Sequence, residues 1–223
     1  MSIINNLIER LHSFKKNKKE SEVMKLEVNR SKHLFIHIHV PKTAGSSFNK
    51  ILEKNFGECF AKLTGKFIAQ YPNFKKHQWN KFISRHPGVI AAASHKFNLD
   101  IPFGHDNKQI VAIAFLRDPV ERFFSFYFHM RHRKGADCIQ KKMSAPEYLD
   151  FKTNNGEGYL PGQVGWLIGE KKYSLTELKQ LVREGKLILG RTERFQETLD
   201  HLNNLYPDLF QYTDSVKSNV STR

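Results

Sequence analysis

A short apolar segment that runs directly into a basic loop constrains this chain most. Residues 34–40 are apolar and rich in β-favoured side chains, as expected of a buried parallel strand. The loop that follows carries Lys42, Gly45, Ser46 and Ser47, and residues 48–56 have the pattern of a helix. The glycine and the serines therefore lie at a helix N-terminus, where unpaired N–H groups and the helix dipole favour an anion. We interpret the loop as a phosphate site; the alternative is an ordinary strand–turn–helix with a capping serine.

The loop differs from a Walker A loop, in which the lysine follows the second glycine, because Lys42 precedes Gly45. The charge of the whole chain also indicates an anionic partner. Lys and Arg number 36 against 22 Asp and Glu, a formal net charge of +14. Nucleotide phosphates, an acidic glycan, nucleic acid and anionic lipid all fit such a charge, which does not choose between them.

Strand and helix patterns alternate along the rest of the chain. Further strands are predicted over residues 89–94, 110–116 and 187–189, and further helices from residue 119 and over residues 145–151, 175–184 and 194–205. This order predicts an α/β domain of three layers, with a central parallel sheet flanked by helices. In such sheets ligands bind beyond the carboxyl ends of the strands.

A second candidate phosphate motif follows the predicted strand 110–116. Arg117 leaves this strand at the same rim as Lys42, and Asp118 is placed to cap a helix that begins at Pro119. Arg122 and Ser125 share one face of that helix, and a guanidinium beside a hydroxyl suits a second phosphate. The alternative is a capped helix in which Asp118 pairs with Arg122. Two such sites without an acidic Walker B segment favour a nucleotide phosphorylated at both the 5′ and 3′ positions.

Residues 1–30 are predicted to be separate from a single domain over residues 31–223. Apolar residues at helical spacing, followed by lysines, predict an amphipathic helix and a basic linker. The helix either docks on its own domain or a second copy, or rests on a membrane surface. We find no apolar run long enough to span a membrane, no secretion signal, and only two cysteines. We therefore expect a cytoplasmic protein, either free or at the membrane face.

Two motifs of this chain together resemble those of sulfotransferases that use 3′-phosphoadenosine 5′-phosphosulfate (PAPS). They are HVPKTAGSSF over residues 39–48 and RDPVERFFSFY over residues 117–127. The resemblance is closest to the branch with heparan and uronyl 2-O-sulfotransferases and their bacterial relatives. Weaker matches at residues 163–169, 189–195 and 219–221 extend it over residues 33–221. It implies the sulfotransferase fold, which is P-loop-like, and transfer of a sulfuryl group to a hydroxyl of a glycan or glycolipid.

The resemblance also assigns roles to residues of the two motifs. Those implied to hold the 5′-phosphosulfate are Pro41, Lys42, Thr43, Ala44, Gly45, Ser46 and Ser47. Arg117 and Ser125 are implied to hold the 3′-phosphate. Sulfuryl transfer should resemble phosphoryl transfer, so Lys42 would neutralise the bridging oxygen of the leaving group. No metal is expected, because basic side chains can balance the departing nucleotide.

His95, directly after the predicted strand 89–94, is the candidate general base, since the family places its catalytic histidine there. An imidazole with a pKa of about 6.5 can accept the proton of the acceptor hydroxyl. Ser94 stands where the family often has glycine. The alternative for His95 is a histidine merely hydrogen-bonded at a strand end. Glu53 is the alternative base.

The sequence allows more than one role for several other residues. His37 and His39 share one face of the first strand, either as two ligands of a metal without an identifiable third, or as packed or hydrogen-bonded histidines. Candidates for the adenine or acceptor pocket are Gln163, Thr192 and Glu193. Residues 131–134 could face an anionic acceptor, and Lys217, Ser218 or Arg223 could reach the nucleotide.

Two other functions compete with the sulfotransferase. An ATP-dependent small-molecule kinase would need Mg²⁺ and acidic residues to hold it. A non-enzymatic, basic nucleic-acid-binding module would show binding that falls steeply with salt. We expect a hydroxyl-bearing acceptor as the partner, and no nucleic acid.

Overall fold

The computed structural model describes residues 32–63, 76–104, 108–132, 142–154, 162–169 and 173–211. The predicted N-terminal helix lies outside these residues, as do Lys217, Ser218 and Arg223. The strands are β1 (His33–Ile38), β2 (Phe60–Lys62), β3 (Ala91–Ser94), β4 (Gln109–Leu116) and β5 (Leu187–Arg191). They form one sheet in the order β2-β3-β1-β4-β5, and every neighbouring pair is parallel.

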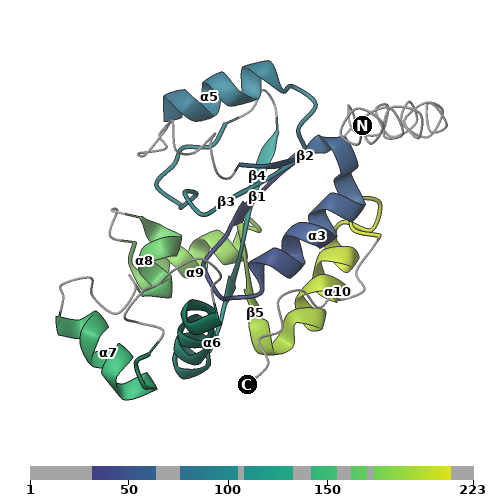
Figure 1. Ribbon diagram of the computed structural model, residues 1–223. Helices are drawn as coiled ribbons and strands as arrows, with labels where there is room; N and C mark the ends of the chain where they lie inside the picture. The colour runs from purple at the N-terminus through teal and green to yellow at the C-terminus, as the bar shows by residue number, and fades with distance from the viewer. Residues whose placement is uncertain are drawn as a thin grey trace, which may run out of the picture.

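Helices connect the strands and flank the sheet (Figure 1). They are α3 (Gly45–Phe56), α5 (Lys76–Arg85), α6 (Pro119–His132), α7 (Ala145–Asn154), α8 (Gln163–Ile168), α9 (Leu175–Arg183) and α10 (Phe195–Leu205). Two short 3₁₀ turns are η1 (Gly57–Cys59) and η3 (Thr192–Arg194). The segments β2, α5 and α8 are additions to the predicted pattern.

The alternation of side chains along β1 produces the layers. Leu34, Ile36 and Ile38 point to one face, where they join a core that includes Trp79 of α5 and Leu167 of α8. Phe35 points to the opposite face and joins a second core, built mainly with α3 and α10. Both faces of the sheet are therefore covered, as the continuous apolar strands require. The predicted three-layer α/β architecture is confirmed.

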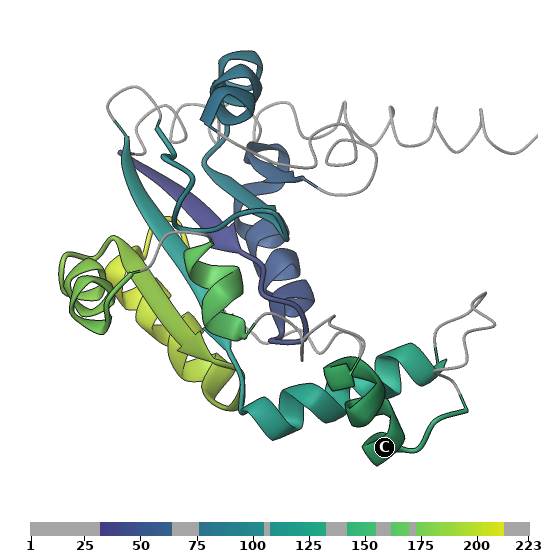
Figure 2. The same ribbon diagram turned by 90° about the vertical axis from the view of Figure 1, so that its left-hand side faces the viewer.

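The central strands bring the candidate motifs to one edge of the sheet. β1 lies between β3 and β4, and all three run in the same direction. Their carboxyl ends lead into residues 39–44, His95 and Arg117. From that edge, α6 continues beyond the end of β4 and packs with α7 away from the sheet (Figure 2). Within the part of the chain that the structure describes, no helix is long and apolar enough to cross a membrane.

Candidate active site

The loop between β1 and α3 has an unusual backbone conformation. Lys42 and Ala44 adopt left-handed φ angles of 67° and 64°. Such angles cost non-glycine residues on the order of 1–3 kcal/mol each, and they cluster at ligand sites. Thr43, buried between the two, donates its hydroxyl to the carbonyl of Val40 at 2.9 Å. This bond helps to hold the loop in its strained shape.

Helix α3 begins on this loop, at Gly45 rather than at Phe48 as the sequence predicted. The N–H groups of Ser47 and Phe48 both donate to the carbonyl of Ala44, at 2.9 and 3.1 Å. The left-handed Ala44 thereby closes the first helical turn three residues early, without a side-chain cap. The N–H groups of Gly45 and Ser46 then open the helix, where the helix itself supplies no acceptor. A helix N-terminus of this kind, preceded by the lysine at residue 42, has the features that favour an anion.

The second motif is attached to this loop by two arginines. The buried Arg122 donates from Nε to the carbonyl of Pro41 at 3.0 Å. Arg117 donates from Nη1 to the carbonyl of Lys42 at 3.5 Å, and its Nη2 lies 3.5 Å from the carboxylate of Glu121. Burial is the main cause that lowers the pKa of Lys42, and the charge of Arg117 lowers it further. Lys42 and Arg117 are thus two cations at the same edge of the sheet, and a bound anion would reduce the repulsion between them.

Arg122 and Ser125 differ in their surroundings, although the sequence placed them together as a phosphate pair. Arg122 is 1% exposed and ties α6 to the loop, whereas Ser125 is half-buried one turn further along α6. Asp118 caps α6 as predicted, since its carboxylate accepts from the N–H groups of Val120 and Glu121 at 2.9 and 3.0 Å. The carboxylate is therefore used for the cap, and Arg117 stands at the start of a well-defined helix.

The backbone around Arg117 is held by residues that the sequence had suggested for an adenine or acceptor pocket. Gln163 of α8 accepts from the N–H of Arg117 at 2.7 Å and donates to its carbonyl at 2.6 Å. Thr192 donates to the carbonyl of Leu116 at 3.1 Å, and Glu193 accepts from the N–H of Asp118 at 2.8 Å. Their described contacts fix the end of β4, so we assign them a positioning role.

Three histidines stack where β1 and β3 end. The ring of His39 lies 5.1 Å from that of His37 and 3.9 Å from that of His95, measured between ring centroids. Burial lowers the pKa of His37 to about 4 and, with the nearby histidines and Lys62, the pKa of His39 to about 2. Both rings are therefore neutral at physiological pH.

His95 is the exposed member of this stack. Its Nδ1 lies 2.8 Å from the carbonyl oxygen of His39. Because a carbonyl can only accept, Nδ1 carries the proton and Nε2 keeps a free lone pair. Partial burial is the main cause that lowers the pKa of His95; the hydrogen bond to His39 opposes this shift and the charge of Lys62 adds to it. His95 is thus neutral at pH 7 and suited to accept a proton.

The alternatives named from the sequence have less support. Glu53 is exposed on α3, eight residues beyond Gly45, which corresponds to about 12 Å along the helix axis. The Nδ1 atoms of His37 and His39 both approach the side chain of Asn49, at 2.7 and 3.5 Å. Among the described residues, no group of three His, Cys, Asp or Glu side chains has the arrangement of a metal site.

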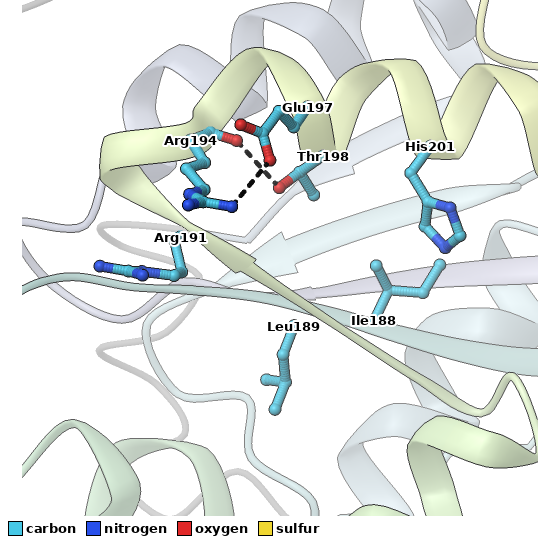
Figure 3. Close-up of a pocket in the computed structure, with 7 residues that line it drawn as sticks. All are labelled: Ile188, Leu189, Arg191, Arg194, Glu197, Thr198 and His201. Atoms are coloured by element: carbon cyan, nitrogen blue, oxygen red, sulfur yellow. Dashed lines mark hydrogen bonds and ion pairs between the residues drawn. The ribbon is translucent and has the colours of Figure 1, made fainter.

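A separate hollow of about 270 Å³ lies between β5 and α10 (Figure 3). The side chains that line it are Ile188, Leu189, Arg191, Arg194, Glu197, Thr198 and His201. Its arginines already have acidic neighbours, because Arg194 lies 3.5 Å from Glu197 and Arg191 lies 3.7 Å from Glu193. The hollow therefore lacks the uncompensated positive charge of the Lys42 loop.

Comparisons with known proteins bear on the family and the fold of this chain. A model described as "Sulfotransferase family" matches residues 28–213. A protein of Archaeoglobus fulgidus, described as uncharacterized, is 27% identical over 192 residues, which cover 79% of this chain and 74% of that protein. The crystal structure of mouse sulfotransferase SULT7A1 complexed with PAP matches with a TM-score of 0.51 and 12% identity over 85% of this chain. This chain spans 60% of the mouse chain's length, and the likeness concerns the fold.

Proposed function

Because this chain belongs to the sulfotransferase family, we propose that it transfers the sulfuryl group of PAPS to a hydroxyl group of a carbohydrate. The observation that carries this proposal is the junction of the two cationic motifs. Arg117 and Arg122 donate to the carbonyls of Lys42 and Pro41. Because these bonds hold the two motifs next to each other, we infer that one nucleotide can bind to both. The mouse relative was solved with PAP, which supports an adenosine nucleotide as the donor scaffold.

The donor loop suits a 5′-phosphosulfate. The proposed contacts come from Pro41, Lys42, Thr43, Ala44, Gly45, Ser46 and Ser47. Lys42 and the N-terminus of α3 supply positive charge where the leaving group becomes negative, an interaction that strengthens in the transition state. Arg117 and Ser125 are the proposed 3′-phosphate ligands. In this proposal, Lys42, Arg117 and the N-terminus of α3 neutralise the charge of the departing nucleotide, and no metal ion takes part.

His95 is the proposed general base. Its Nε2 would accept the proton of the acceptor hydroxyl while the hydroxyl oxygen bonds to sulfur and the bond from sulfur to the phosphate oxygen breaks. Its fixed tautomer supports this role, because the hydrogen bond to the carbonyl of His39 leaves Nε2 free. The carbohydrate acceptor rests on the resemblance to the heparan and uronyl branch. The charge of Lys62, which acts on His95, would suit a glycan or glycolipid with an anionic group.

The remaining parts of the proposal concern the whole chain. We assign residues 31–223 to the sulfotransferase domain and residues 1–30 to an N-terminal helix and linker, which would contact a membrane surface or a second copy. A cytoplasmic location, either free or at the membrane face, stays a prediction.

Nucleotide binding tests the donor assignment directly. We expect 3′,5′-ADP at 100 times its dissociation constant to raise the unfolding midpoint by about 5–10 °C without added metal, which follows from a stabilisation of about 2.7 kcal/mol. The isomer 2′,5′-ADP has the same charge and is the matched control, for which a much smaller shift is expected. A shift that requires ATP and Mg²⁺ would instead favour the kinase. Salt-sensitive binding to RNA or DNA, unaffected by substitution of Lys42, would favour the nucleic-acid-binding module.

Gln163 provides a test of the 3′-phosphate site. In the variant Gln163→Leu, the N–H and carbonyl groups of Arg117 lose their partners, at a cost of about 1–3 kcal/mol for each unsatisfied group. We expect a fall of several degrees in the unfolding midpoint and an affinity for 3′,5′-ADP at least about tenfold weaker, measured by thermal unfolding and calorimetry. Gln180→Leu is the control, since the side chain of Gln180 is exposed on α9 and donates to the carboxylate of Glu184. Unchanged affinity in Gln163→Leu would contradict the positioning role.

A further inference from the structure

His39 occupies the space between the candidate base and the donor loop. Its ring stacks with both His95 and His37, at centroid distances of 3.9 and 5.1 Å. The ring also reaches the first residue of α3, because a Cβ atom added to Gly45 would overlap Cδ2 and Nε2 of His39. Glycine at residue 45 therefore allows the close approach of the imidazole to the start of the helix.

The side chain of Asn49 determines which nitrogen of His39 carries its proton. The Oδ1 atom of Asn49 lies 2.7 Å from Nδ1 of His37, and an amide oxygen can only accept, so that Nδ1 is protonated. The Nδ2 group of Asn49 faces Nδ1 of His39 at 3.5 Å, and an amide nitrogen can only donate. Nδ1 of His39 is therefore the acceptor, and the single proton of this neutral imidazole lies on Nε2.

The Nε2–H group of His39 is consequently directed to the edge of the ring that meets Gly45. The contacts among described residues assign it no hydrogen-bond acceptor, and the side chain retains 7% of its exposure. This donor is at the edge of a mostly buried ring and keeps some access to solvent. A ligand that excluded water from it without accepting its hydrogen bond would incur a free-energy cost. The N-terminus of α3 and Lys42 attract an anion to the same loop, and an oxygen of that anion would satisfy the donor.

We propose that His39 is a catalytic residue, whose Nε2–H donates a hydrogen bond to an oxygen of the sulfuryl group while that group passes from the loop of Lys42 to the acceptor beside His95. This inference rests on the proposed function. It gives His39 a role distinct from that of His95: His39 donates a hydrogen bond throughout the transfer, and His95 removes a proton.

The burial of His39 suits this role. If His39 gained a proton on Nδ1, it would lose its hydrogen bond from Asn49 and would bring a positive charge near that of Lys62. Burial keeps the imidazole neutral over the working range of pH, so its donor strength does not depend on pH. A rigid, neutral donor between the base and the leaving group stabilises negative charge without competing for the proton.

Two substitutions of equal length isolate the donor. His39→Gln retains an N–H group in the side chain, whereas His39→Met has a similar shape without one. Both variants lose the ring that stacks on His95, so the decrease in kcat that they share reports the loss of packing. We expect kcat of His39→Gln to exceed that of His39→Met by about 10- to 100-fold, the usual value of a hydrogen bond to a charged group. The two variants should bind 3′,5′-ADP, which lacks the sulfuryl group, with equal affinity.

The wild-type protein offers a measurement that does not depend on activity. With ¹⁵N-labelled histidine, NMR should find the proton of His39 on Nε2 at pH 7. His86→Phe, which changes an exposed histidine directly after the end of α5, is the control for the loss of a histidine. Equal kcat for the Gln and Met variants, or a proton on Nδ1, would overturn the role of His39. A wild-type protein that binds 3′,5′-ADP poorly would overturn the proposed function itself.

Discussion

Replacing His95 by alanine should lower the turnover of PAPS by about 10²- to 10⁴-fold, the usual contribution of a general base. The reason is the geometry of the imidazole, whose Nδ1 bonds the carbonyl of His39 and whose Nε2 is free at the exposed end of the histidine stack. The affinity for 3′,5′-ADP should stay within a few-fold of wild type, because the base contacts the acceptor rather than the nucleotide. Transfer from radiolabelled PAPS to a panel of glycans and glycolipids measures the first quantity, and calorimetry the second.

The pH dependence of this variant distinguishes a base from a structural histidine. His95 must be neutral to accept a proton, and burial holds its pKa below the ordinary 6.5. In the wild type, kcat/KM should therefore remain high at pH 6.5 and decline only at lower pH, as His95 becomes protonated. His95→Ala should lose this acidic limb, while His86→Ala, a control at an exposed site, should retain it. Turnover of His95→Ala within a few-fold of wild type would exclude the proposed base.

Replacing Lys42 by methionine should lower kcat by about 10²- to 10³-fold, as the loss of one electrostatic donor does in other enzymes. Methionine keeps an unbranched apolar stem, one atom shorter than lysine, but removes the charge that would meet the leaving group. The left-handed backbone at residue 42 costs methionine and lysine alike, since neither is glycine. Steady-state transfer of radiolabelled sulfate measures this effect, together with the affinity for 3′,5′-ADP, which should also weaken.

Stability should respond to this change in the opposite direction. Burial and Arg117 lower the pKa of Lys42, so the folded protein holds this charge at a cost. The unfolding midpoint of Lys42→Met should therefore equal or exceed that of the wild type. Lys50→Met on the exposed side of α3 is the matched control, with wild-type turnover expected. Reduced turnover that merely follows reduced stability would argue against a direct role of Lys42.

The sequence predicted the architecture because its signals are local. The apolar segments that became β1, β3 and β4, and the proline that begins α6, are each readable within a few residues. Asp118 was correctly identified as a cap for the same reason. The strand β2 has three residues and α8 has six, which is too short for periodicity to distinguish them from loops.

The contacts that join the candidate site could not be predicted in this way. Arg122 reaches Pro41 across 81 residues of sequence, and Gln163 reaches Arg117 across 46. The sequence predicts Arg122 as a phosphate ligand and Gln163 as part of a pocket, because residue type alone does not reveal a partner in the fold. The stacked rings of His39 and His95, 56 residues apart, likewise depend on the pairing of β1 with β3. The acceptor and the roles of the individual site residues remain predictions.

The attachment of Arg117 to the carbonyl of Lys42 has a consequence for nucleotide selectivity. On the proposed function, a donor without a 3′-phosphate would leave this guanidinium close to the charge of Lys42, and among the described residues Glu121 is the acidic side chain that pairs with it. The repulsion between Lys42 and Arg117 would therefore make the affinity for a nucleotide with a 3′-phosphate higher than that for a nucleotide without one. A nucleotide with both phosphate groups would neutralise the two cations, whereas one without the 3′-phosphate would leave part of the repulsion in the complex.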